Sequence, residues 1–120
     1  MTSSQSLDNK IANLNFSKIY DCYLNKIEKK NRTKSELDEI IEWFTGFKEN
    51  QVQKITEQNL SLEEFFAQAT IHPNADLITG SICGHRIEDI TNPLTQNVRR
   101  LDKLVDELAK GHALEKILPK

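Results

Sequence analysis

The stretch NPLTQNVRRLDKLVDELAKG, residues 92–111, decides the fold class because it is the longest amphipathic helical pattern in the chain. Asn92 and Pro93 form an N-cap and first-turn pair, and Gly111 is a typical helix stop. Its apolar residues recur at the spacing that places them on one helix face: Leu94, Val98, Leu101, Leu104, Val105 and Leu108. A stripe this wide has to pack against other elements, so we expect a helical domain around it.

Two earlier patterns provide the expected packing partners. One begins near Asn15 and carries an apolar stripe that ends before two lysines. The next begins at Thr33, which forms a Thr-x-x-Glu capping box with Glu36, and stops at Gly46. We expect these two helices and the one over residues 92–111 to supply most of the core.

Three weaker helical patterns complete the prediction. One covers residues 49–58, one begins at a second capping box formed by Ser61 and Glu64, and a short final turn covers residues 112–118. Residues 1–10 are polar, and we expect a disordered N-terminal lead there. Residues 11–120 are then a single helical domain.

Residues 76–90 are the hardest part of the chain to interpret. They contain several apolar residues but also Gly80 and Gly84, and a glycine in a helix interior costs about 1 kcal/mol. We expect one short or broken helix, with a pair of strands as the alternative. The predicted fold class is therefore all-α, a compact bundle of five to seven short helices, or α+β if residues 76–90 form strands.

Composition limits the functional classes. The net charge is −2, from 16 basic and 18 acidic residues, which argues against a dedicated nucleic-acid binder with a basic excess. No apolar run approaches the ~18 residues typical of a membrane helix, and the polar start does not resemble a signal peptide. With only two cysteines, we expect a cytoplasmic protein with free thiols that does not associate with membranes.

The segment TGSICGHR, residues 79–86, is the candidate ligand-binding site. Glycines allow a ligand to approach the backbone, whose N–H groups could cradle a phosphate while an arginine pairs with its charge. The candidate ligand-binding residues are Gly80, Cys83, Gly84, His85 and Arg86. Neither the P-loop nor the dinucleotide-binding spacing is present, and close helix packing at the two glycines is the alternative interpretation.

No catalytic signature is present, so the sequence leaves open whether the chain is an enzyme. Cys83 and His85 are two residues apart, which separates their side chains on a helix but places them on one face of a strand. With Cys83, the histidines at 72, 85 and 112 have the chemistry of zinc ligands, yet none of them has a partner at ligand spacing. We therefore expect no metal and no cofactor.

Residues 26–34 contain the only basic cluster, and the helices predicted over residues 33–45 and 49–58 suggest a helix-turn-helix. The cluster consists of Lys26, Lys29, Lys30, Arg32 and Lys34. Four carboxylates on the helix predicted over residues 33–45 lie beside the cluster and would repel a phosphate backbone; they are Glu36, Asp38, Glu39 and Glu42. Weak nucleic-acid binding through this cluster is thus a disfavoured alternative.

Trp43 lies just off the apolar stripe of its predicted helix. It either closes the edge of the core or anchors a partner, since tryptophan is enriched at interface hot spots. The main expectation is a small interaction or regulatory module without catalytic activity, which binds another protein or itself. The alternatives are a ligand-binding domain or enzyme with its site at residues 80–86, and the nucleic-acid binder.

Three stretches also carry a resemblance to a known family. They are RTKSELDEII (32–41) with Trp43 and Thr45-Gly46, then LITG (77–80) with ICG (82–84) and IEDI (87–90), and LDKLVDELAKG (101–111). Over roughly residues 11–118 the chain resembles the bacterial family known as domain of unknown function 2200. The resemblance implies a bacterial, cytosolic, single-domain protein and brings no reaction, ligand or catalytic residue.

Overall fold

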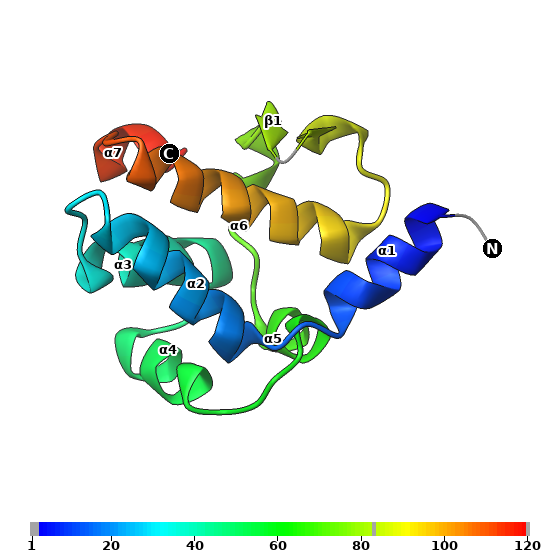
Figure 1. Ribbon diagram of the computed structural model, residues 1–120, viewed down its shortest axis with the longest axis horizontal. Coiled ribbons are helices and arrows are strands. Elements are labelled where there is room, and N and C mark those ends of the chain that lie inside the picture. The colour runs from blue at the N-terminus through cyan, green and yellow to red at the C-terminus, as the bar shows by residue number, and fades with distance from the viewer. Residues whose placement is uncertain (1–2, 83, 120) are drawn as a thin grey trace.

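The longest helix, α6 (Pro93–Ala109), crosses the molecule and contacts most other elements (Figure 1). The computed structural model describes residues 3–82 and 84–119. In these residues it contains seven α-helices and one small antiparallel sheet, so the predicted all-α fold class is confirmed. The Asn92 side chain accepts a hydrogen bond from the backbone N–H of Thr95 at 3.0 Å, which is the expected N-cap of α6.

Helices α2 (Phe16–Glu28) and α3 (Lys34–Thr45) pack against each other and against α6. The capping box at the start of α3 is present: the Thr33 hydroxyl accepts from the N–H of Glu36, and the Glu36 carboxylate accepts from the N–H of Thr33. Gly46 ends α3 in the left-handed region with φ +74°. The helix boundaries expected here are confirmed.

Three short helices cover the ends of this arrangement. Helix α4 (Glu49–Thr56) packs on α2 and α3, and α7 (Leu114–Ile117) packs on the end of α6. Helix α5 (Leu62–Gln68) packs on α6 and on the first helix, α1 (Ser3–Ala12). The second capping box, at the start of α5, is also present. Gly111 has φ +96° and lies in the turn between α6 and α7.

Over residues 3–10 the structure differs from the expected disordered lead, because helix α1 (Ser3–Ala12) begins there. Residues 1 and 2 of the expected lead lie outside the described residues. The helix is held by contacts with α6 that are distant in sequence. Ile11 and Ala12 are buried, and the Thr95 hydroxyl donates a hydrogen bond to the Asp8 carboxylate at 2.7 Å. Local sequence composition carries no information about such contacts.

Residues 75–82 and 84–89 contain two 3₁₀ turns and a pair of short strands in place of the expected short or broken helix. The elements are η1 (Ala75–Leu77), β1 (Ser81–Ile82), β2 (His85–Arg86) and η2 (Ile87–Asp89). Ser81 pairs with Arg86 and Ile82 with His85, antiparallel. The strand alternative is thus the correct one locally, but two residues per strand are too few to change the fold class.

One cluster of buried side chains draws on every helix and forms the core. The largest fully buried residues are Phe16, Ile27, Leu37, Ile40, Ile41, Phe44, Leu62, Phe65, Ile87, Leu101, Leu104 and Leu108. Most of them come from α2, α3 and α6, as the sequence predicts. Among the described residues, no helix combines the length and the apolar character needed to cross a membrane.

Candidate functional site

The two glycines of the predicted ligand site are turn residues and do not support helix packing. Gly80 has φ +104° and Gly84 has φ +78°, a region that residues with a side chain rarely adopt. A Cβ added at Gly84 would meet nothing within 4 Å, and one at Gly80 would meet only the end of the Lys103 side chain. The interpretation of close helix packing at these positions is wrong, because the backbone conformation alone requires glycine.

Two groups of this loop that could bind an anion, the Gly80 N–H and the Arg86 guanidinium, already interact with the carboxylate of Glu88. The Gly80 N–H donates to the Glu88 carboxylate at 2.9 Å, and the Arg86 guanidinium lies 3.5 Å from the same carboxylate. Hydrogen bonds from backbone N–H groups, its own and that of Gly80, lower the pKa of Glu88, so it is charged at neutral pH. A phosphate would have to displace this carboxylate.

Of the predicted ligand-binding residues, the structure brings only His85 to a cavity. Cys83 lies outside the described residues, and Gly80, Gly84 and Arg86 do not line the cavity. Its volume is about 310 Å³, and its polar lining consists of Asp8, His85, Asp89, Thr91, Asn92, Thr95 and Arg99. The cavity does not favour an anionic ligand, because Asp8 and Asp89 place two carboxylates in its lining. The Arg99 guanidinium is already paired with Asp102 at 3.3 Å.

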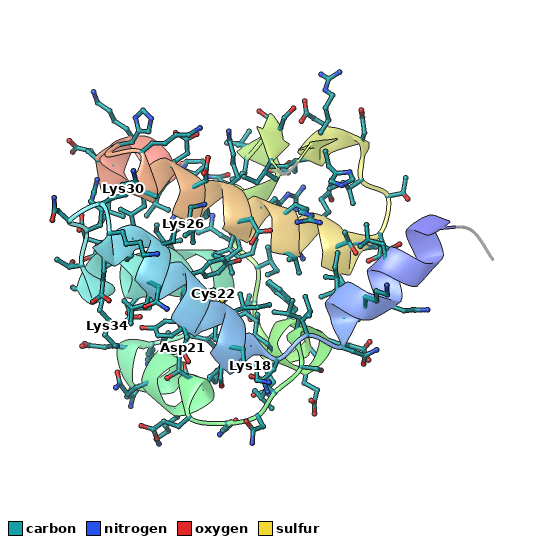
Figure 2. All side chains as sticks on the ribbon, viewed as in Figure 1. Lys18, Asp21, Cys22, Lys26, Lys30 and Lys34 are labelled. Carbon is teal, nitrogen blue, oxygen red and sulfur yellow. The ribbon has the colours of Figure 1, made fainter. Side chains whose placement is uncertain are left out.

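The basic cluster of residues 26–34 is largely neutralised within the molecule. Lys26 pairs with Asp106 at 3.2 Å, Arg32 with Glu36 at 2.5 Å and Lys34 with Asp38 at 2.9 Å. Lysine side chains remain exposed along α2 and the turn after it, where Figure 2 shows Lys18 and Lys26 on α2 and Lys30 in the turn. The ion pairs weaken the hypothesis of nucleic-acid binding, because paired cations have less charge to offer to phosphates.

Trp43 lies at the edge of the core and also lines an open groove. Its ring is half-buried and stacks on the His72 ring, with ring centroids 4.1 Å apart and planes inclined by 15°. His72 is fixed in turn, because its Nδ1 accepts the N–H of Asn74 at 3.0 Å. Both predicted roles of Trp43, core edge and interface, are therefore compatible with its position.

The groove beside Trp43, which we call the Trp43 groove, has a volume of about 410 Å³. It lies between α3 and the C-terminal segment, and its lining residues are Glu39, Trp43, Leu114, Glu115, Leu118 and Pro119. The four apolar members are all partly accessible, whereas Ile117 between them points into the core. The groove is thus an apolar surface with a carboxylate on each wall.

The C-terminal wall of this groove, residues 114–119, is not among the sites predicted from the sequence. A signal was present, since Leu114 and Leu118 have the i,i+4 spacing of one helix face while Ile117 has the spacing of the adjacent face. The sequence could not show that residues 114–119 lie beside α3, because this placement depends on the turn after α6.

A second hollow, which we call the acidic cleft, lies on the other side of Glu39. Its volume is about 390 Å³, and it is lined by α3 and α4 residues: Lys34, Ser35, Asp38, Glu39, Glu42, Glu49 and Gln53. Burial, followed by the charges of Glu49, Asp38 and Glu39, raises the pKa of Glu42. Within residues 3–82 and 84–119, no group of side chains is arranged to hold a metal ion.

Asp38 differs from the other carboxylates of the acidic cleft because both its oxygens are engaged. One oxygen accepts the Tyr20 hydroxyl at 2.5 Å and the other the Lys34 ammonium at 2.9 Å. Burial and then the hydrogen bond to Asp38 raise the pKa of Tyr20 to about 12, so the phenol remains protonated. Asp38 therefore ties α2 to α3, and the remaining carboxylates face the cleft.

Comparisons with known proteins identify relatives but no activity. The family described as "Uncharacterized protein conserved in bacteria (DUF2200)" matches residues 10–119. The crystal structure of the uncharacterised protein SP1917 is similar, with a TM-score of 0.86 and 38% sequence identity, covering 91% of this chain and 90% of that one. A search of curated proteins gives no match. The match over almost the whole chain confirms the resemblance seen in the sequence, and the chain belongs to the DUF2200 family of uncharacterised bacterial proteins.

Proposed function

We propose that this chain is a small cytoplasmic interaction module that binds another protein through the Trp43 groove. The observation that carries the proposal is the position of Trp43: its ring is held on one side by His72, yet it lines an accessible groove with Leu114, Leu118 and Pro119. Rigid aromatic side chains that are partly exposed in a concave apolar surface are typical anchors of protein interfaces. No catalytic role is part of the proposal.

The test is affinity capture from bacterial lysate with the wild-type chain and two charge-matched variants. Leu118→Glu places a charge in the Trp43 groove, whereas Leu14→Glu changes an exposed leucine, 46% accessible, at the junction of α1 and α2. We expect a protein that the wild type and Leu14→Glu both retain and that Leu118→Glu loses. Circular dichroism shows whether Leu118→Glu is folded. Equal capture by all three proteins, or no specific capture, contradicts the proposal.

A second candidate function is the binding of a small ligand in the cavity that His85 lines. The specific observation in its favour is the volume of about 310 Å³ with polar groups from α1, η2 and α6 around it. Native mass spectrometry of protein purified gently at low salt tests it. A retained small molecule that Arg99→Ala loses supports this candidate, and a bare chain counts against it.

A further inference from the structure

We infer that the Trp43 groove and the acidic cleft together bind a polypeptide segment that carries lysine or arginine side chains next to an apolar anchor. This inference rests on the proposed function and adds the chemical class of the partner. The apolar anchor would lie against Trp43 and Leu118, and the cationic side chains would lie against the carboxylates of α3 and α4.

The Trp43 groove and the acidic cleft are adjacent, because Glu39 lines both hollows. Glu39 lies four residues before Trp43 and three before Glu42 on α3, so the three side chains share one face of the helix. The Trp43 groove and the acidic cleft therefore lie next to each other on α3, with the exposed Glu39 side chain between them. One segment of polypeptide can occupy both.

The two hollows carry negative charge that the described residues do not neutralise. Five carboxylates and one ammonium line the two hollows, and the ammonium of Lys34 is already paired with Asp38. In the described part of the chain, no lysine, arginine or histidine pairs with Glu39, Glu42, Glu49 or Glu115. A cationic partner would neutralise this charge, and an acidic partner would be repelled.

The acidic cleft suits a cationic side chain better than a metal ion. The described carboxylates are not arranged as metal ligands, so the cleft does not offer a metal the close oxygen set that it needs. Its volume of about 390 Å³ suits the long stem of lysine or arginine, which packs its methylenes on a surface while the head meets a carboxylate. The adjacent groove, about 410 Å³, is large enough for an apolar side chain.

The experiment is selection of short random peptides displayed on phage against the immobilised full-length chain, followed by affinity measurement of the selected peptides. We expect sequences with lysine or arginine beside an aromatic or aliphatic residue, and affinity that falls as salt is raised. Glu39→Lys should weaken binding about tenfold or more. The matched control, Glu57→Lys, changes an exposed glutamate outside both hollows and should leave affinity within about twofold.

The outcomes separate this inference from the proposed function. If peptides bind and Leu118→Glu abolishes binding, but they lack basic residues or are insensitive to Glu39→Lys, the inference is overturned and the docking groove stands. If no selected peptide depends on Leu118, both are overturned. Loss of binding with Glu57→Lys as strong as with Glu39→Lys would also overturn the inference, because the effect would then come from net charge.

Discussion

At the scale of single residues, Glu36 combines a helix capping box with an ion pair. Its carboxylate accepts hydrogen bonds from the Arg32 guanidinium, the shortest of 2.5 Å, and from the N–H of Thr33 at 3.0 Å. The bond from Arg32, with further contributions from Thr33, lowers the pKa of Glu36 from its ordinary 4.5 to about 2. The charged form therefore stabilises the start of α3.

Glu36→Gln keeps the capping box but removes this charge, so we expect the free energy of unfolding at pH 7 to fall by about 1 kcal/mol. Because the pKa is lower in the folded state, the stabilisation is present above pH 4.5 and is lost as the pH falls toward 2. The difference between wild type and variant, measured by urea unfolding, should shrink over this range.

Glu64→Gln is the matched control, because Glu64 makes the same capping box without an ion pair in the described part of the chain. It should cost less than Glu36→Gln. A cost of Glu36→Gln that stays constant between pH 5 and about pH 2 would refute the assignment.

Gly46 and Gly111 allow the cost of a left-handed backbone to be separated from that of a close contact. Both have positive φ, but a Cβ at Gly46 would lie 3.1 Å from the Thr70 carbonyl oxygen, whereas one at Gly111 would meet nothing within 4 Å. Gly111→Ala should cost about 1 kcal/mol, and Gly46→Ala more, about 2 kcal/mol. Thermal unfolding measures both costs. Equal costs would show that the Thr70 carbonyl group moves away from the added Cβ without loss of stability.

At the scale of elements, α2 and α5 are in contact through a stacked aromatic pair and through hydrogen bonds at their starts. Phe16 and Phe65 are fully buried, and their rings stack with centroids 3.8 Å apart and planes inclined by 11°. The same two helices are linked at their starts, where the N–H of Phe16 donates to Leu60 and the N–H of Leu62 to Leu14. The short helix α5 is thus held by its contacts, since seven residues are too few for a stable isolated helix.

Phe65→Leu removes the stacked ring with little change in volume, and we expect the free energy of unfolding to fall by about 1–2 kcal/mol. Phe66→Leu, at the neighbouring half-buried position, should cost less than half as much. Urea unfolding of both variants tests this. A larger cost at Phe66 would show that α5 is held mainly by its outer face.

The elements that sequence predicts well are those whose signals are local. Asn92, Thr33, Ser61 and Gly46 each act on groups a few residues away, so the starts and ends of their helices could be found without knowing the fold. The sequence indicates the strands β1 and β2 only as an alternative and does not indicate helix α1, because both are held by distant partners such as Lys103 and Thr95. The Trp43 groove has the same origin, since its walls meet only after the chain folds.

At the scale of the whole molecule, one contiguous core connects all seven described helices. Trp43 is the only tryptophan, and it packs against the margin of that core. We expect urea unfolding followed by Trp43 fluorescence to coincide with unfolding followed by far-ultraviolet circular dichroism. A fluorescence change at lower urea would show that the groove opens before the core unfolds.

The charge distribution of the whole chain predicts the result with nucleic acid. The net charge is −2, and three of the five cations in the basic cluster are ion-paired. In a gel-retardation assay with duplex DNA at low salt, where phosphate contacts are strongest, we expect no shift. A shift that Lys29→Glu and Lys30→Glu abolish would instead establish the cluster as a nucleic-acid surface.

The wall of the Trp43 groove formed by residues 114–119 also bears on how a partner search should be designed. Helices α1 and α7 lie toward opposite ends of the long axis (Figure 1), so the two ends of the described chain differ in their distance from the groove. An affinity tag fused beyond Pro119 would stand at the mouth of the groove and compete with the partner for space. The same tag placed ahead of α1 would leave the mouth open. Interaction screens with the two fusions should therefore disagree, and the partner should be recovered with the N-terminal fusion.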